Sequence, residues 1–335
     1  MAPSIQETAS AALLAHSRIK PYITQTPLIS SRNPSRKGTT TLLFKAENFQ
    51  RTGSFKLRGA MAKLSATTGT TNTDTGSSNG TKMITASSGN HGIGASCAAS
   101  ALGKHLTVVL PENVVQSKLE KIKSYGVDVL LHGAETGLAE QYAQSLAKTG
   151  EYIYISPYND PDVIAGQGTI GVEILEQCRD TSMEVDNVFV AMGGGGLISG
   201  VGSVMKSLSP RTKVYGVSAT NSKALAASMA AGRVVEVPHM ETLADAVAGG
   251  IDEDTVTLEL ARQVVDVVIE CDEEEIREAL RGLAFEEGML VEGAAALAFA
   301  GFRKVMQEGG VTGKTNVIVL CGGNFDVDVM KSVLR

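Results

Sequence analysis

Short runs of β-branched residues alternate with helical stretches along most of this chain, and few folds accommodate that alternation. The runs predicted as strands are 83–85, 106–110, 127–131, 152–155, 188–192, 214–218 and 316–321. Helices are predicted at 6–20, 93–102, 116–125, 138–149 and around 168–178. The alternation indicates an α/β fold whose parallel sheets carry helices on both faces. Ligands of such folds bind at the carboxyl ends of strands, so the turns there are the candidate functional segments.

The size and charge of the chain exclude several classes of protein. With 335 residues, of which 43% are apolar, it is long enough for about two domains and a sizeable core. A net charge of −6 and the lack of a basic run argue against nucleic acid and acidic membrane surfaces as partners. No run of about 18 apolar residues is present, so no transmembrane helix is expected.

The cysteines indicate a reducing compartment. Cys97, Cys178, Cys271 and Cys321 are far apart, form no CxxC pair and lack the spacing of zinc ligands. The N-terminal helix has no basic segment ahead of an apolar block, unlike a secretory signal. We therefore expect free thiols and a cytoplasmic protein.

One segment interrupts the alternation. Residues 67–81, TTGTTNTDTGSSNGT, contain no apolar side chain and cannot contribute to a core. We predict a flexible surface loop, and a functional lid is the weaker alternative because nothing in the segment suits binding or catalysis.

A lysine stands in the small and apolar stretch Gly53–Ala60, where a helix is expected to begin. If Lys56 is removed from water, the pKa of its amine falls and the amine becomes nucleophilic, as Schiff-base chemistry requires. Taken alone, the stretch favours a plainer interpretation, in which the lysine starts a helix and its amine reaches water.

The segment Ser87–Gly92, SSGNHG, lies between a predicted strand and a predicted helix. Consecutive N–H groups at a helix start bind anions, and the hydroxyl and amide side chains add donors. A substrate carboxylate would fit there. Capping of the helix by Ser or Asn explains the segment equally well.

Four consecutive glycines, Gly193–Gly196, follow another predicted strand and precede a helix. Glycines let the backbone wrap closely around a phosphate, and the helix dipole then points at it. Because four glycines cost much chain entropy, a purely structural turn would not need them. The run does not fit G-x-G-x-x-G, so it is not a dinucleotide motif.

Two further residues are weaker candidates. Cys321 ends the last predicted strand in Leu320–Asn324, where it could contact a ligand, although a buried cysteine more often only packs. The five histidines show no metal spacing, and His91 is the one that could lie near a substrate.

Together and in this order, the motifs resemble those of the fold-type II pyridoxal-phosphate (PLP) enzymes, in particular the threonine/serine dehydratase and serine racemase branch. The motifs are GSFKLRGA, SSGNHG, AGQGT (165–169), GGGGL and CGGN, and the resemblance runs from about Ile19 to the end. It implies two open, doubly wound α/β domains with PLP in the cleft between them. The large domain would be 1–54 and 156–335, and the small domain 55–155. Relatives are commonly dimers, so a homodimer is expected.

The resemblance also assigns roles to individual residues. Lys56 would form the Schiff base, with Phe55 under the ring and Asn90 on the ring hydroxyl. Cys321 would face the pyridine nitrogen, and because a thiol cannot hold a pyridinium proton as a carboxylate would, the ring would stay neutral. The cofactor contacts expected are Phe55, Lys56, Asn90, Gly193, Gly194, Gly195, Gly196, Leu197 and Cys321. The substrate contacts expected are Ser87, Ser88, Gly89, Asn90 and His91.

The implied activity is the conversion of a β-hydroxy amino acid, such as L-serine or L-threonine, to a 2-oxo acid and ammonia, with Lys56 removing the Cα proton. The alternative is an amino-acid racemase in which Lys56 and Ser88 act on opposite faces, with elimination as a side activity. Positions that hold a divalent metal in relatives align with Ser218 and Ala224, which do not suit a hard cation, so no metal is expected.

Two other classes of function stay open. A non-catalytic protein that binds a phosphorylated ligand is disfavoured by the intact lysine, and a β-synthase using a sulfur or nitrogen nucleophile is a further alternative. The tract 290–294, LVEGA, departs from the E-P-[ST] pattern of the best-known relatives, so the substrate is in doubt. Candidates that could line the pocket and set its preference are Tyr125, Tyr158 and Glu292.

Overall fold

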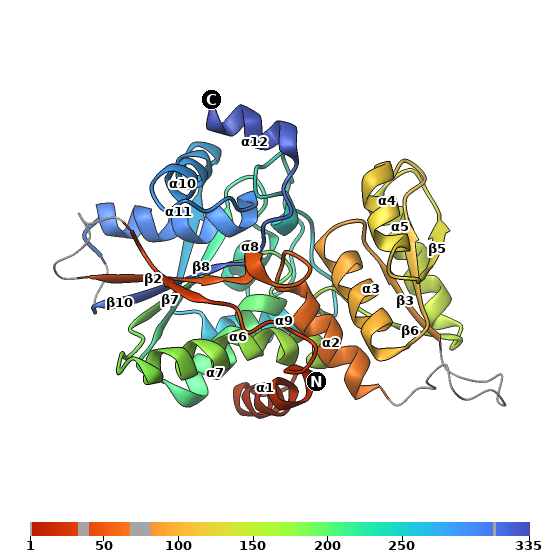
Figure 1. The fold of residues 1–335 in the computed structure, drawn as a ribbon, viewed down its shortest axis with the longest axis horizontal. Coiled ribbons are helices and arrows are strands. Elements are labelled where there is room, and N and C mark those ends of the chain that lie inside the picture. The colour runs from red at the N-terminus through yellow and green to blue at the C-terminus, as the bar shows by residue number, and fades with distance from the viewer. Residues whose placement is uncertain (1, 33–39, 68–81, 311–312) are drawn as a thin grey trace.

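The computed structural model describes residues 2–32, 40–67, 82–310 and 313–335. These residues form two units, each built on one sheet, which lie side by side in Figure 1. The loop predicted at 67–81 falls, beyond its first residue, outside the described residues.

The larger sheet has six strands in the order β1-β2-β10-β7-β8-β9. All neighbours are parallel except the antiparallel pair β1–β2. The strands are β1 (Leu28–Ser30), β2 (Thr41–Ala46), β7 (Asn187–Ala191), β8 (Lys213–Ala219), β9 (Val267–Cys271) and β10 (Thr315–Leu320). Every residue of β7 and β10 is buried, as expected for central strands covered on both faces.

Helices cover both faces of this sheet (Figure 1). One face carries α10 (Glu273–Phe285) and α11 (Gly293–Gln307), and the other carries α7 (Gly196–Leu208), with α6 (Pro161–Asp180) and α1 (Ile5–Ile19) packed behind it. Shorter helices complete the unit: α8 (Ala224–Ala231), α9 (Thr257–Val264) and α12 (Val327–Leu334), with the 3-10 turns η2 (Glu47–Phe49) and η3 (Asp245–Val247).

The smaller sheet has four parallel strands in the order β5-β4-β3-β6. They are β3 (Lys82–Ala86), β4 (Leu106–Leu110), β5 (Asp128–Leu131) and β6 (Tyr152–Tyr154). One face is covered by α5 (Thr136–Lys148) and the other by α3 (Asn90–Leu102), with α4 (Gln116–Lys123) alongside. Helix α2 (Lys56–Ala66) packs on both α3 and α6, and so joins the two units.

The order of the strands determines where a ligand would bind. In the larger sheet the chain proceeds outward from β7 to β8 and β9, then returns to place β10 on the other side of β7. In the smaller sheet β3 is followed outward by β4 and β5 before β6 returns to its other side. Crevices of open α/β sheets form at such reversals, outside the carboxyl ends of the strands. Those ends are followed by Gly193, Cys321, Ser87 and Pro157.

The predicted fold class, α/β with parallel sheets and helices on both faces, is confirmed. Strands β1, β2 and β9 were not predicted. The helix expected around 168–178 begins earlier, at Pro161, because the Asp160 carboxylate caps it by accepting from the N–H groups of Asp162 and Val163. The division into 1–54 with 156–335 and 55–155 stays a prediction. In the described part of the chain, no helix is long and apolar enough to cross a bilayer.

Candidate active site

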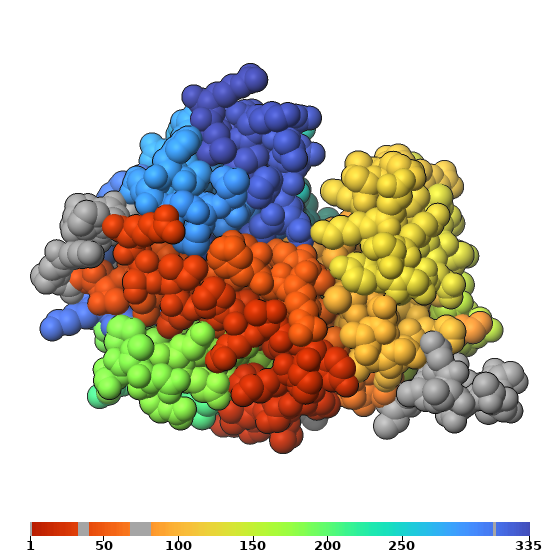
Figure 2. All heavy atoms as spheres, in the orientation of Figure 1, coloured from red at the N-terminus to blue at the C-terminus, as the bar shows by residue number. Residues whose placement is uncertain are grey.

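A cavity of about 780 Å³ lies where the carboxyl ends of the two sheets face each other. Figure 2 shows the surface hollowed between the C-terminal segments, in blue, and the smaller unit, in yellow. The volume lies within the range of small-molecule and cofactor sites. The structure brings every predicted site residue to the wall of this cavity: Phe55, Lys56, Ser87, Ser88, Gly89, Asn90, His91, Gly193, Gly194, Gly195, Gly196, Leu197 and Cys321.

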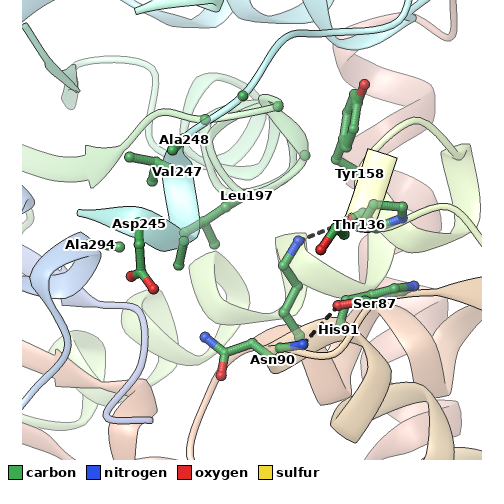
Figure 3. Close-up of a pocket in the computed structure, with 18 of the residues that line it drawn as sticks. Ser87, Asn90, His91, Thr136, Tyr158, Leu197, Asp245, Val247, Ala248 and Ala294 are labelled. Atoms are coloured by element: carbon green, nitrogen blue, oxygen red, sulfur yellow. Dashed lines mark hydrogen bonds between the residues drawn. The ribbon is translucent and has the colours of Figure 1, made fainter. Parts of the chain in front are cut away.

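The loop that carries Lys56 is held against the end of β10. The Phe55 N–H donates to the Cys321 carbonyl at 3.0 Å, and the Gly323 N–H donates to the Gly53 carbonyl at 2.8 Å. These bonds place Lys56 at the start of α2 on the cavity wall, where its Nζ donates to the Pro157 carbonyl at 2.8 Å. Figure 3 shows this cavity, with Val247 and Leu197 above Asn90 and Ser87 in the view. Lys56 therefore reaches across from the larger sheet to the segment that follows β6.

The environment of Lys56 makes its amine unusually nucleophilic. Burial lowers the pKa of the Lys56 amine to about 8, against the opposing effect of nearby acidic groups. Near pH 8 about half of these amines are uncharged, whereas an exposed lysine is almost wholly protonated. Lys56 begins α2, as the plainer interpretation expects, but its side chain is only partly exposed and faces the cavity.

The tetraglycine turn is packed so closely that side chains would not fit. A Cβ on Gly194 would lie 2.5 Å from the Tyr158 ring, and one on Gly193 would lie 2.9 Å from the Val247 backbone. Gly195 has φ +89°, a left-handed conformation that glycine adopts without strain, and it is the N-cap of α7. The first N–H groups of α7 have no acceptor within the helix, so they are available to an anion in the cavity.

The segment Ser87–His91 offers a second helix start. The N-cap of α3 is Gly89, and no side chain caps this helix, so the capping interpretation of the segment is wrong. The Ser87 hydroxyl instead accepts from the Gly89 N–H at 3.2 Å. A Cβ on Gly92 would lie 1.9 Å from the Ser87 carbonyl, so the turn is tight. The arrangement leaves the first N–H groups of α3 available for a carboxylate.

The imidazole ring of His91, which lines the cavity, is bonded on one side to the smaller unit. Its Nε2 lies 3.0 Å from both the Thr85 hydroxyl and the Ile155 carbonyl. Burial lowers the pKa of the His91 imidazole to about 3, so the ring is neutral and donates from Nε2 to the carbonyl. The ring therefore ties α3 to the segment before Pro157, and a contact with substrate is left to its backbone N–H or its Nδ1.

Several cavity residues belong to no motif. Glu140 and the stretch 245–252 line the cavity, as do the suggested Tyr158 and Glu292. Asn324, the last residue of the CGGN motif, also lines it, although no role was predicted for its side chain. Tyr125 packs instead against the core of the smaller unit. The missed residues come from a helix face and an irregular segment, where neither periodicity nor spacing signals a site.

The described residues contain no group of three or more His, Cys, Asp or Glu side chains that could hold a metal ion. Ser218 is buried within β8, and Ala224 begins α8.

Comparison with known proteins gives one consistent result. Residues 19–322 match the family model described as pyridoxal-phosphate dependent enzyme. The chain is 36% identical to an L-threonine ammonia-lyase of Thermotoga maritima, over 96% of this chain and 76% of that protein. It is 35% identical to the catabolic L-threonine dehydratase of Escherichia coli K12, over 95% and 93% of the two chains. Maize serine racemase superposes with a TM-score of 0.85 at 30% identity, over 97% of this chain and 95% of that one.

Proposed function

The chain belongs to the pyridoxal-phosphate dependent enzyme family, and from this premise we propose that it is an ammonia-lyase. It converts a β-hydroxy amino acid, such as L-threonine or L-serine, to the 2-oxo acid and ammonia. The observation that carries the proposal is the single cavity in which the Lys56 amine, the glycine turn before α7 and the start of α3 meet. The relatives named for threonine ammonia-lyase and threonine dehydratase activity support the same reaction.

The residues present fit PLP. Lys56 offers a buried amine of lowered pKa to its aldehyde, and the α7 N-terminus offers N–H groups to its phosphate. Asn90 and Cys321, which also line the cavity, would meet the ring. When bound, PLP withdraws electrons from the substrate Cα and makes its proton acidic.

The protein's own groups then orient the substrate and move protons. The N–H groups at the start of α3 bind the substrate carboxylate, with the Ser87 and Ser88 hydroxyls alongside. Lys56 Nζ takes the proton from Cα as the C–O bond at Cβ breaks. The hydroxyl takes up one proton and leaves as water, so one H from Cα and one OH from Cβ are lost in all. The enamine that remains gains a proton at Cβ and becomes an imine, and addition of one water to its C=N bond gives one 2-oxo acid and one ammonia.

A substrate screen tests the proposal. The protein is loaded with PLP and incubated with both enantiomers of serine, threonine and other β-hydroxy amino acids, and 2-oxo acid, ammonia and the opposite enantiomer are measured. We expect equal amounts of 2-oxo acid and ammonia from at least one L-substrate. Abundant D-enantiomer with negligible 2-oxo acid would instead identify a racemase.

The racemase alternative is kept because Ser88 lines the cavity with Lys56 and because maize serine racemase is similar in structure. Racemisation needs proton transfer on both faces of Cα, and Ser88 is the candidate for the face opposite Lys56. We predict that Ser88→Ala retains 2-oxo acid release from the L-substrate and loses action on the D-enantiomer. Initial rates with each enantiomer check this, and an equal loss with both would contradict the role of Ser88.

The glycine turn gives a second prediction. In Gly194→Ala the added Cβ would lie 2.5 Å from the Tyr158 ring, so either the ring or the turn must move. We expect the dissociation constant for PLP to rise at least tenfold, which corresponds to about 1.4 kcal/mol, measured by absorbance titration of the cofactor-free protein. Gly282→Ala is the control, because its Cβ would make only ordinary contacts, the nearest at 3.5 Å. Wild-type affinity in Gly194→Ala would argue against this turn as the phosphate site.

We propose three further features of the protein. They are the division into domains 1–54 with 156–335 and 55–155, a homodimer, and a cytoplasmic location. The mass of the holoenzyme in solution tests the second.

A further inference from the structure

The carboxyl group of Glu292 lies in the wall of the cavity. The sequence suggested this residue, within the tract 290–294, only as one that could line the pocket. Glu292 is only 3% exposed and is the N-cap residue of α11. Its N–H donates to the Gly322 carbonyl at 3.1 Å, and a Cβ on Gly322 would lie 2.7 Å from the Glu292 carboxyl carbon. The carboxyl group can lie against the end of β10 only because residue 322 is glycine.

The Glu292 carboxylate holds two of the groups proposed to meet the cofactor ring. Asn90 Nδ2 donates to its two oxygens at 2.9 and 3.0 Å, and the Cys321 thiol lies 3.9 Å from one of them. The Asn324 N–H donates to the same carboxylate at 3.3 Å, and the Asn324 side chain donates to Asn90 Oδ1 at 2.7 Å. Both ends of the Asn90 amide are therefore held from one side of the cavity.

Near neutral pH, Glu292 is present both as the carboxylate and as the carboxylic acid. Burial raises the pKa of the Glu292 carboxyl to about 7, and Asp245 on η3 acts in the same direction. The N–H groups of Asn90 and Asn324 and the ammonium of Lys56 on α2 act against it. Asp245 in turn faces Lys118 and Asp326.

Gain of a proton changes what this carboxyl group can hold. The carboxylate accepts bonds at both oxygens, and such charge-assisted bonds are roughly twice as strong as neutral ones. A carboxylic acid has a hydrogen on one oxygen, which then cannot serve the N–H donors in the same way. Protonation of Glu292 therefore weakens its hydrogen bonds with Asn90 Nδ2 and changes the group that the Cys321 thiol faces.

We propose that Glu292 is a positioning residue of the PLP site, which holds the Asn90 amide and the Cys321 thiol in place and releases them when it is protonated. The proposal rests on the proposed function, and it makes the surroundings of the cofactor ring depend on one carboxyl group. The cofactor spectrum and turnover then change together around neutral pH.

The test is a pH titration of the absorption spectrum of the PLP-loaded holoenzyme, for wild type and Glu292→Gln. Wild type is expected to show a spectral transition with a midpoint near pH 7. Glu292→Gln is expected to lose that midpoint, because the amide does not titrate, and its kcat should fall about ten- to a hundredfold, with KM little changed. An unaltered midpoint and kcat in Glu292→Gln would overturn the proposal.

A matched control separates this role from the loss of any buried carboxylate. Glu287 is 2% exposed and accepts from Ser31 and the Arg32 N–H outside the cavity. Glu287→Gln should keep the wild-type spectrum and midpoint in any preparation that binds PLP. If Glu287→Gln also lost the midpoint, the effect would not come from Glu292 and the proposal would fail.

Folding of the variant is checked on the cofactor-free protein. Because folding raises the pKa of Glu292 from 4.5 to about 7, its stabilising contribution is present below about pH 4.5 and is lost as pH rises through about 7. The glutamine of Glu292→Gln does not titrate, so this variant does not lose stability in that way as the pH rises. At pH 8 the melting temperature of the variant should therefore equal or exceed that of wild type. If the variant does not fold, Glu292→Asp serves instead: its shorter carboxylate cannot reach Asn90, so kcat should fall, and an unchanged kcat would overturn the proposal.

Different results contradict the proposed function and the role of Glu292. Wild type without a PLP band or without 2-oxo acid release contradicts the proposed function. Wild type with both, but with Glu292→Gln indistinguishable from it, contradicts only the role of Glu292.

Discussion

Replacing Lys56 with alanine is expected to lower kcat for 2-oxo acid release by at least about a thousandfold. The Lys56 amine is the group that would bind the cofactor aldehyde and then take the Cα proton, so one substitution removes both functions. Its Nζ lies at the cavity wall, bonded to the Pro157 carbonyl, with its pKa lowered to about 8. The measurement is the initial rate of 2-oxo acid release at saturating substrate and PLP.

A second readout identifies the residue directly. Borohydride reduction of the holoenzyme should leave the cofactor on the peptide that contains Lys56, and Lys56→Ala should not be labelled there. Lys63→Ala is the control, since Lys63 lies on the same helix but pairs with Asp160 and Asp162. Label on another lysine, or more than a tenth of wild-type kcat in Lys56→Ala, would contradict the assignment.

The parts of the fold that were predicted are those in which local pattern and burial agree. Strands β7 and β10 each contain a run of four apolar residues, because helices cover both of their faces, and such runs are visible in a sequence. Strand β1 has three residues and β9 carries exposed valines, so neither shows that pattern. Their places depend on pairing with β2 and β8, which is a property of the assembled sheet.

The same distinction holds for the candidate site: residues in a local sequence pattern were predicted, and residues defined by contacts with distant parts of the chain were not. Gly193–Gly196 and Ser87–Gly92 were found because tight turns before helices require glycine and small residues in sequence. Glu292 was only a weak suggestion, because its significance comes from contact with Asn90, 202 positions away. His91 lines the cavity, and its contact with substrate stays a prediction, whereas the bond from its ring to Ile155 is one that no local pattern could reveal.

A buried charge network beneath α2 was missed altogether. Arg58, two residues after Lys56, is completely buried and forms ion pairs with Glu47 at 2.8 Å and Glu173 at 2.7 Å. Lys45 also pairs with Glu173, and each of these side chains is at most 1% exposed. In a sequence these residues look like ordinary surface charges. The network joins β2, η2, α2 and α6, and so anchors the helix that begins at Lys56.

Replacing Arg58 with methionine is therefore expected to have the largest effect on stability. Methionine fills similar space but leaves Glu47 without its bidentate partner and Glu173 with Lys45 alone. Removing one partner from a buried ion pair costs about 3–5 kcal/mol, because the remaining charge is still buried. The free energy of unfolding, from urea denaturation of the cofactor-free protein, measures the effect.

Two further variants test whether the loss of stability comes from the buried carboxylates that Arg58→Met leaves without a partner. Arg211→Met breaks an ion pair with Glu184 of similar length, 2.9 Å, but both side chains are more than four-fifths exposed, so little change is expected. Adding Glu47→Gln to Arg58→Met removes one of the unpaired buried charges and should recover part of the lost free energy of unfolding. A double variant less stable than Arg58→Met would mean that lost packing around α2, and not unpaired charge, is what destabilises the protein.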